Sequence, residues 1–310
     1  MPLLIVDCDR HVANSFPTIN DALVCARVND TIRVLPGKYG ESIKITKAVT
    51  IEGEPNEDGL KVRTALDLRL LAPNGSDTPL PRARAIVRQP LIQAKNRDVV
   101  HVCPGVTGAV ICGLRIKQLG GGGYGVNFEG CSPEMRECDV QSAGRACVVV
   151  HKQAVPSVHH CRIHSGVGGG VLVLGEGSTG IFEHNRIFSN KLAGVNILAG
   201  ADPQFRANAI CDGYSTGVYV YKGGKGVLED NTITGNVKSG VSVASGGDPV
   251  LRGNTISGNQ ASGVFVYEKG AGTYEGNDVH GNAGAGVEIA TGGAPTLSKN
   301  KIRDSCSIGV

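Results

Sequence analysis

A repeat of 23 residues runs from residue 185 to the end of the chain and limits the folds open to it. Asparagine, isoleucine or valine, and glycine each return at that interval, and each repeated glycine is followed by valine. A fixed period between about 20 and 50 residues is typical of stacked-repeat proteins. The asparagines are Asn185, Asn208, Asn231, Asn254, Asn277 and Asn300, and the glycines are Gly194, Gly217, Gly240, Gly263, Gly286 and Gly309.

Each repeat also contains short segments in which apolar and other residues alternate, such as Val195-Asn196-Ile197 and Val218-Tyr219-Val220. This alternation is the two-residue period of a β-strand, and no window within the repeats has the spacing of an amphipathic helix. Three short strands and three turns in each repeat predict an all-β fold, a single-stranded parallel β-helix with about 23 residues per coil. Coils about 4.8 Å apart would stack equivalent residues directly above one another.

The repeated columns have different expected roles. We expect valine and isoleucine to fill the lumen, and glycine and asparagine to occupy the corners. Glycine adopts positive φ without strain, and asparagine tolerates it. The asparagine amides are also expected to bond to the copies above and below.

The N-terminal residues 1–30 are expected to form a short strand and a capping helix. Ser15 or Asn14 is placed to cap the helix, and Ile19, Leu23 and Ala26 share one helical face. A helix in this place would cover the open end of the solenoid, which exposes a lumen and unpaired strand edges.

The whole chain, 1–310, is expected to be one β-helix domain. Residues 54–91 interrupt the pattern as a turn-rich, basic loop insertion, and regular coils occupy 92–310. Such an insertion leaves a solenoid on one side and is either a functional loop or a surface excursion.

Two stretches resemble known families. The run from Pro17 to Gly53, which includes Pro36-Gly37-Lys38-Tyr39, looks like the opening of pectin-lyase-like right-handed β-helix proteins. The later segments 247–256, 263–267 and 270–277 resemble the β-helix (CASH-type) half of F-box-only proteins, which select substrates for ubiquitin ligases. The resemblance implies a right-handed coil that binds protein rather than sugar. No F-box precedes the helix and no zinc-finger cysteines follow it, so a ligase role is not implied.

The composition of the chain gives no indication of a nucleic-acid, membrane or metal partner. A net charge of +3 does not indicate nucleic acid or an anionic membrane, and no apolar run reaches membrane length. Residues 1–9 lack the pattern of a signal peptide. The ten cysteines include no C-x-x-C pair, which argues against a zinc or redox motif. We therefore expect a cytoplasmic protein with no cofactor and no metal.

Outward aromatic side chains give the main functional prediction, a non-enzymatic scaffold that binds a protein partner along one wall. The rings are expected at the same outward positions two coils apart, with lysines at their rim, although they could instead pack on one another or stack against sugar. The predicted contact residues are Tyr219, Tyr221, Phe265, Tyr267, Lys222 and Lys269.

The alternative is a carbohydrate-active enzyme: a polysaccharide lyase, epimerase or glycoside hydrolase. A patch of histidine, arginine and carboxylate side chains could abstract a proton α to a uronate carboxylate, with arginine neutralising the charge, or could be a solvated corner. The repeat predicts two neighbouring stacks of side chains at equivalent positions of successive coils. The first contains Glu137, His160 and His184, and the second contains Asp139, Arg162 and Arg186.

The last residue, Val310, would stand at the start of a strand without a closing helix. An uncovered terminal coil predicts end-to-end self-association, a partner that covers it, or a longer native chain.

Overall fold

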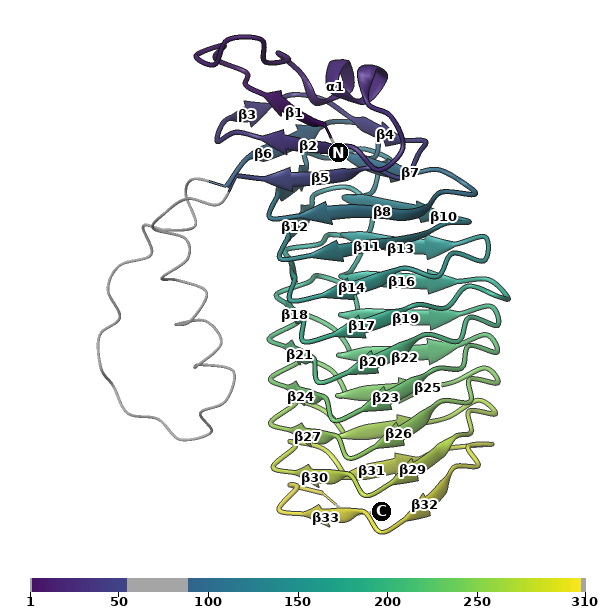
Figure 1. Ribbon diagram of the computed structural model, residues 1–310. Coiled ribbons are helices and arrows are strands. Elements are labelled where there is room, and N and C mark those ends of the chain that lie inside the picture. The colour runs from purple at the N-terminus through teal and green to yellow at the C-terminus, as the bar shows by residue number, and fades with distance from the viewer. Residues whose placement is uncertain (1, 55–88, 308–310) are drawn as a thin grey trace, which may run out of the picture.

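A computed structural model describes residues 2–54 and 89–307. In these ranges the chain winds into a column of stacked coils with three parallel sheets, here called sheets A, B and C (Figure 1). A regular coil contributes one strand to each sheet in that order, and each strand pairs with its equivalent in the next coil. The predicted parallel β-solenoid is therefore confirmed.

The strand bounds are as follows. Sheet A contains β1 (Leu3–Val6), β2 (Thr31–Val34), β5 (Thr50–Gly53), β8 (Thr107–Cys112), β11 (Ser132–Arg136), β14 (Ser157–His159), β17 (Ile181–Glu183), β20 (Gln204–Arg206), β23 (Val227–Glu229), β26 (Val250–Arg252), β29 (Thr273–Glu275) and β32 (Thr296–Ser298). Sheet B contains β3 (Lys38–Tyr39), β6 (Leu91–Ala94), β9 (Arg115–Gln118), β12 (Asp139–Ser142), β15 (Arg162–His164), β18 (Arg186–Phe188), β21 (Ala209–Cys211), β24 (Thr232–Thr234), β27 (Thr255–Ser257), β30 (Asp278–His280) and β33 (Lys301–Arg303). Sheet C contains β4 (Ile43–Ile45), β7 (Val100–Val102), β10 (Val126–Glu129), β13 (Val148–His151), β16 (Val171–Leu174), β19 (Val195–Leu198), β22 (Val218–Tyr221), β25 (Val241–Val243), β28 (Val264–Val266) and β31 (Val287–Ile289).

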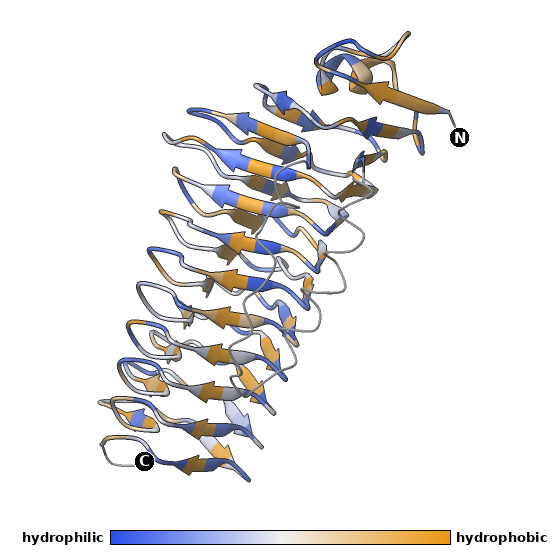
Figure 2. Ribbon diagram, turned by 90° about the vertical axis from the view of Figure 1, so that its left-hand side faces the viewer, coloured by the Kyte–Doolittle hydropathy of each residue, from blue (hydrophilic) through white to orange (hydrophobic). Residues whose placement is uncertain are grey.

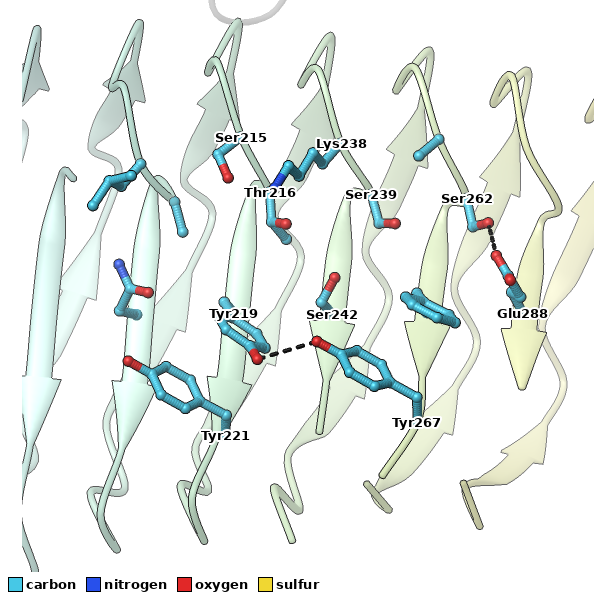
Figure 3. A pocket seen from close by; sticks show the side chains of 15 residues that line it. Ser215, Thr216, Tyr219, Tyr221, Lys238, Ser239, Ser242, Ser262, Tyr267 and Glu288 are labelled. Atoms are coloured by element: carbon cyan, nitrogen blue, oxygen red, sulfur yellow. Dashed lines mark hydrogen bonds between the residues drawn. The ribbon is translucent and has the colours of Figure 1, made fainter. Parts of the chain in front are cut away.

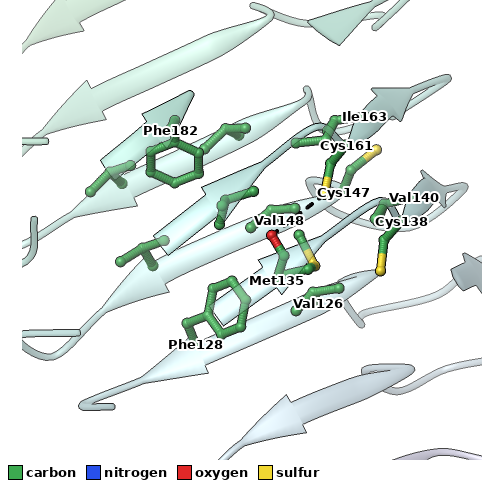
Figure 4. Packing of buried hydrophobic residues seen from close by; sticks show 14 of the residues in the cluster. Val126, Phe128, Met135, Cys138, Val140, Cys147, Val148, Cys161, Ile163 and Phe182 are labelled. Atoms are coloured by element: carbon green, nitrogen blue, oxygen red, sulfur yellow. Dashed lines mark hydrogen bonds between the residues drawn. The ribbon is translucent and has the colours of Figure 1, made fainter. Parts of the chain in front are cut away.

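Apolar side chains that point inward from all three sheets form one continuous core, as the alternation predicts. Figure 2 shows apolar bands in the strands along the length of the column. The rings of Phe182 and Phe205 stack with their centroids 4.5 Å apart, and Phe128 packs near Met135 in the close-up of Figure 4. The core fixes which residues of each strand face solvent, and so decides what each wall displays.

The asparagine column forms the predicted ladder of amide hydrogen bonds. The backbone N and side-chain Nδ2 of Asn231 both donate to Oδ1 of Asn254, at 2.9 and 3.0 Å, and Nδ2 also donates to the carbonyl of Phe205 at 2.9 Å. A second ladder, absent from the sequence prediction, joins Asn236, Asn259 and Asn282 in the same way.

The corner conformations differ from the prediction. Positive φ belongs to the residue before each asparagine, with values of 54° at Asp230 and 60° at Gly253, rather than to the asparagine itself. The repeated glycines are required instead because a side chain at these positions would clash with neighbouring atoms. A Cβ on Gly240 would lie 2.5 Å from Cγ2 of Ile256 and 2.8 Å from the carbonyl oxygen of Gly263. Backbone and core side chains therefore leave no room for a larger residue in this column.

The helix α1 (Ile19–Cys25) begins later than predicted. Its N-cap is Thr18, whose hydroxyl accepts a hydrogen bond from the backbone N of Asp21 at 3.1 Å, so the expected caps Ser15 and Asn14 are wrong. Threonine succeeds here because its extended backbone aims the hydroxyl at the first turn.

The expected apolar face of α1 is buried. Ile19, Leu23 and Ala26 face inward, and the helix contacts β1, β2 and β4. The carboxylate of Glu41 accepts hydrogen bonds from the backbone N of Ile19 and of Asn20, at 2.9 and 3.0 Å. These contacts fasten the helix to the first coils, and its role as a cap stays a prediction.

Two predictions concern residues outside the described ranges. Residues 55–88, most of the expected insertion 54–91, are not described, and neither is Val310, on which the end-to-end prediction rests. In the described chain all ten cysteines are free thiols. No helix among these residues is long and apolar enough to cross a membrane.

Candidate functional site

The predicted aromatic side chains come together on the outer face of sheet C. Valines pointing inward from β22 leave Tyr219 and Tyr221 outward, and β28 with the residue after it presents Phe265 and Tyr267. Tyr219 pairs in register with Ser242 of β25, which pairs with Phe265. The two ring pairs are thus two coils apart, as the repeat predicts.

The rings pack on one another, which was one of the alternatives left open. The centroids of Tyr219 and Tyr221 are 4.3 Å apart, and those of Phe265 and Tyr267 are 4.5 Å apart, both pairs being stacked. The hydroxyls of Tyr219 and Tyr267 form a 3.1 Å hydrogen bond across Ser242 (Figure 3). Burial, reinforced by this bond, raises the pKa of Tyr219. The four rings therefore form one connected frame.

A groove of about 630 Å³ lies along this frame. Besides the tyrosines, the hydroxyl-bearing residues that line it are Ser215, Thr216, Ser239, Ser242 and Ser262. Figure 3 shows most of these hydroxyls along one edge of the groove and Tyr221 and Tyr267 along the other.

Two charged side chains line the groove. Lys238 extends beside Thr216 in Figure 3, and it has no ion-pair partner among the described residues. The carboxylate of Glu288 accepts a hydrogen bond from the hydroxyl of Ser262 at the far end. The groove thus offers an uncommitted cation among hydroxyls.

The predicted rim lysines lie elsewhere. The Lys222 ammonium is 5.8 Å from the centroid of the Tyr221 ring, and neither Lys222 nor Lys269 lines the groove formed by the described residues. Both have positive φ, 50° and 62°, in the turn that follows sheet C. The groove is instead lined by Lys238, which the sequence prediction missed and which lies in the loop between sheets B and C.

A smaller hollow of about 480 Å³ is lined by Ser165, Ser189, Lys191 and Tyr214. These residues follow the strands of sheet B, so the hollow lies on the other side of the same connecting loops.

The residues of the alternative enzyme prediction meet in register on sheet B. Asp139 pairs with Arg162, which pairs with Arg186. Nε of Arg162 lies 3.6 Å from Asp139, which also contacts His164 at 3.2 Å and accepts a hydrogen bond from Nε2 of Gln141 at 3.2 Å. Burial acts to raise the pKa of Asp139, but His164 and Arg162 outweigh it and hold that pKa below its ordinary value. The Arg186 guanidinium lies over the Phe188 ring, 4.5 Å from its centroid.

The second predicted stack occupies the corner between sheets A and B. The rings of His160 and His184 stack with centroids 5.2 Å apart, and Nδ1 of His160 is 3.1 Å from Nδ1 of His159. Glu137 precedes β12 at the same corner, with a φ of 55°. Both predicted stacks therefore form, but on walls other than the one that holds the groove, and their catalytic role stays a prediction.

A polar cluster that the sequence prediction missed occupies sheet C toward its N-terminal end. Asp98 accepts hydrogen bonds from the backbone N of Tyr124 and from Nδ2 of Asn127, each at 2.8 Å. Oδ1 of Asn127, a buried residue, lies 2.9 Å from Nε2 of His151. Asp98, Asn127 and His151 thus form a continuous chain of hydrogen bonds.

A second chain runs beside the first. Glu129 contacts Nε2 of His101 at 2.8 Å and Nζ of Lys152 at 2.6 Å. The hydrogen bond from Lys152 is the main cause that lowers the pKa of Glu129, and the bond from His101 adds to it. Burial lowers the pKa of His151. The cluster therefore places a negatively charged Glu129 next to His151, whose imidazole favours its neutral form.

The cluster could have been found from the strand pattern. His101, Asn127, Glu129 and His151 all occupy outward positions on sheet C, each next to inward valine or phenylalanine. The coils here do not keep the regular spacing, so the 23-residue columns do not align them.

One further group has the composition of a metal site. Asp7, Asp9 and His11 bring one potential ligand atom each to within 4.8 Å of one another, the only such group among the described residues. The carboxylate of Asp7 already accepts hydrogen bonds from the backbone N of Asp9 and of Val12, at 3.0 and 2.9 Å. These contacts are those of a loop closed by an aspartate side chain.

The architecture defines a parallel β-helix protein with a groove on one wall. The family model described as "Right handed beta helix region" matches residues 106–255 and 239–310, and the chain belongs to this family. The predicted right-handed coil is thereby confirmed. Sequence comparison with curated proteins gives no match.

Solved structures support the same fold. The A-module of the mannuronan C-5 epimerase AlgE4 of Azotobacter vinelandii is 14% identical, with 93% of this chain and 72% of that chain covered and a TM-score of 0.58. An alginate lyase of Paenibacillus sp. str. FPU-7 is 12% identical, with 91% and 96% covered and a TM-score of 0.60. The tailspike gp49 of the Acinetobacter baumannii bacteriophage Fri1, a capsular polysaccharide depolymerase, is 9% identical, with 97% and 62% covered and a TM-score of 0.57. At these identities the likeness establishes the fold.

Proposed function

We propose that this protein binds and acts on an acidic polysaccharide that lies along the outer face of sheet C. The observation that carries the proposal is the groove: aromatic rings on one edge, and on the other edge hydroxyls with Lys238 among them, which has no ion-pair partner among the described residues.

The geometry of the wall suits an extended polymer. Strands of sheet C succeed one another about every 4.8 Å, so the two ring pairs are separated by about 9.6 Å along the column. This separation is comparable to the length of two pyranose units in an extended chain. Ser242, the small residue between the ring pairs, leaves the intervening space open.

The chemistry of the groove also fits a sugar chain. A pyranose has an apolar face, which packs against aromatic rings, and an equatorial fringe of hydroxyls, which exchange hydrogen bonds with serine and threonine. Lys238 offers the ammonium group that a carboxylated sugar requires. Lys238 is exposed, so its ammonium stays solvated beside a neutral sugar and gains an ion pair beside a carboxylated one.

The comparisons support this proposal at the level of fold. The similar structures are named as an epimerase of mannuronan, a lyase of alginate and a depolymerase of capsular polysaccharide. Each name refers to a polymeric carbohydrate substrate.

A protein partner on the same wall is the competing proposal, which the resemblance to F-box-only proteins implies. Protein interfaces are centred on a few side chains, often Trp, Tyr or Arg, that fill well-packed, desolvated pockets. Here the rings are half-buried and engaged with one another, and serine and threonine side chains surround them. The groove therefore favours the polysaccharide.

We also propose that α1 closes the N-terminal end of the lumen. Its buried face and its contacts with β1, β2 and β4 support this role.

Affinity electrophoresis of the full chain in gels containing polygalacturonate, alginate or neutral dextran tests the main proposal. We expect retardation by the acidic polymers, weakened by added salt because the contact with Lys238 is exposed to screening. Lys238→Gln and Tyr267→Ala should each reduce affinity about tenfold, since each removes an interaction of about 1–2 kcal/mol.

Matched controls come from sheet B. Lys301→Gln removes an exposed lysine and Phe188→Ala an outward ring, both far from the groove in the fold, and neither should alter retardation. Equal binding by the groove variants and the controls would contradict the proposal. Binding to a protein partner that Tyr267→Ala abolishes, with no affinity for any polymer, would favour the competing proposal.

A further inference from the structure

The Asp98–Asn127–His151 chain of hydrogen bonds fixes the position of a proton on an imidazole. A carboxylate only accepts hydrogen bonds, so the atom of Asn127 that faces Asp98 at 2.8 Å must be the amide Nδ2. The other end of the amide, Oδ1, then faces His151 at 2.9 Å and can also only accept. Nε2 of His151 must therefore carry hydrogen.

This assignment leaves Nδ1 of neutral His151 with a lone pair. No hydrogen bond joins Nδ1 to any other residue in the described part of the chain. The backbone N of Tyr124 donates to Asp98 and holds its carboxylate in place. Asn127 is buried, so its side-chain amide keeps the orientation that this carboxylate imposes. His151 is thus a base of defined tautomer on the surface of sheet C.

Charges of both signs face this imidazole. Glu129 and Asp98 act to raise the pKa of His151, and Lys152 and His101 act to lower it. Burial is the largest influence and lowers that pKa. The neutral imidazole, the form that accepts a proton, is therefore favoured near neutral pH.

The base is in line with the groove. β13, β16, β19 and β22 are successive strands of sheet C. Glu129 pairs with His151, and further along the wall Leu174 pairs with Leu198, which pairs with Tyr221. Three strand spacings, about 14 Å, separate His151 from Tyr221. A polymer held by the rings reaches His151 by continuing along the same wall.

We propose that His151 is the catalytic base of this protein and removes a proton from the carbon next to the carboxylate of a uronate unit. This assignment rests on the proposed function, because the polymer must lie along sheet C. Asn127 and Asp98 are positioning residues that hold the tautomer. The ammonium of Lys152, the neighbour of His151 in the chain, contacts Glu129 at 2.6 Å and has further N–H donors for the uronate carboxylate.

The step is a β-elimination. Nδ1 of His151 takes the proton from C5 of the uronate, and the C–H electron pair becomes the C4=C5 double bond. The bond between C4 and the glycosidic oxygen breaks, and its electron pair leaves on that oxygen, which takes a proton from water. His151 then returns its proton to the solvent. The products are an unsaturated end and a new reducing end.

The test uses the full chain with polygalacturonate and alginate, and follows the ultraviolet absorbance of the unsaturated product. His151→Gln should reduce turnover about 10²–10⁴-fold, the usual contribution of a general base, with retardation in the affinity gels unchanged. Lys301→Gln should leave turnover unaltered.

Asp98→Asn gives a readout that a purely structural role would not move. The introduced amide keeps an oxygen for the backbone N of Tyr124 and turns its NH₂ toward Asn127. Asn127 must then reverse, so that its own NH₂ faces His151. Nitrogen-15 NMR should show the His151 proton on Nε2 in the parent chain and on Nδ1 in Asp98→Asn, and turnover should fall about 10²-fold in the variant.

The outcomes separate the two proposals. Binding of acidic polymers without turnover, turnover that survives His151→Gln, or a parent His151 protonated on Nδ1 would overturn the catalytic assignment and leave the binding proposal standing. Absence of binding would overturn both.

Discussion

Replacing Asn254 with alanine tests whether the amide ladder contributes to stability beyond the apolar core. The side chain is fully buried in the middle of the ladder. Its Oδ1 accepts from the backbone N and Nδ2 of Asn231, at 2.9 and 3.0 Å. Its Nδ2 donates to the carbonyl of Leu228 at 2.8 Å and to Oδ1 of Asn277 at 2.9 Å.

The free-energy cost follows from which partners can be satisfied elsewhere. Nδ2 of Asn231 keeps its bond to the carbonyl of Phe205, and Oδ1 of Asn277 keeps the bond from the backbone N of residue 254. The backbone N of Asn231 and the carbonyl of Leu228 lose this side-chain partner inside the protein. A buried polar group left unsatisfied costs about 1–3 kcal/mol, and two such groups result, so Asn254→Ala should lower the free energy of unfolding by about 2–6 kcal/mol.

Asn300→Ala is the matched control, because Asn300 is the last rung and is partly exposed. Water can replace its bonds, and the expected cost is about 1 kcal/mol. Urea unfolding of both variants at one pH, with the slopes compared to detect any loss of cooperativity, gives the two values. A cost below about 1 kcal/mol for Asn254→Ala, or equal costs for both, would refute the reasoning.

Three other measurements test separate parts of the structure. Gly240→Ala places a Cβ 2.5 Å from Cγ2 of Ile256 and should cost about 1–3 kcal/mol in urea unfolding, whereas Gly122→Ala, where nothing lies within 4 Å, should be nearly neutral; equal effects would contradict the close approach. Thr18→Ala removes the N-cap of α1 and should lower stability by about 1 kcal/mol, which Thr18→Ser should largely avoid. Burial lowers the pKa of His151, so protonation of this imidazole destabilises the folded protein. The stability contributed by the neutral imidazole is fully present above the ordinary pKa of about 6.5 and is lost as the pH falls below it. Parent stability should therefore fall more than that of His151→Gln between about pH 7.5 and pH 5.5, and parallel losses would contradict this sign.

The regular repeat was enough to predict the fold and the position of the rings. Once equivalent residues are known to be neighbours, the alternation in β22 and β28 decides that Tyr219 and Phe265 face outward, two coils apart. Burial of valine drives this choice, and burial can be read from a pattern of apolar residues.

What the repeat could not predict depends on side-chain direction and on irregular coils. Arg206 pairs in register with Glu183 and Glu229 and contacts them at 3.8 and 3.2 Å, yet Arg252, which also pairs in register with Glu229, forms no ion pair with a described glutamate. The interval between repeats in the sequence does not determine the rotamers of exposed side chains.

The coils that carry the polar cluster depart from the constant interval. Val100 pairs with Val126, which pairs with Val148, which pairs with Val171, and these steps differ in length. Columns drawn at a fixed period therefore miss His151 and its partners.

The asparagine ladder makes each coil interchangeable with the next. Every rung from Asn185 to Asn277 donates through two nitrogens to one oxygen of the following rung, so every coil has the same upper and lower boundary. Excision of residues 232–254 would rejoin identical boundaries and remove Ser242, which would bring Tyr219 next to Phe265. The length of the protein, and with it the length of each wall, is thus adjustable in whole turns without redesign of the core.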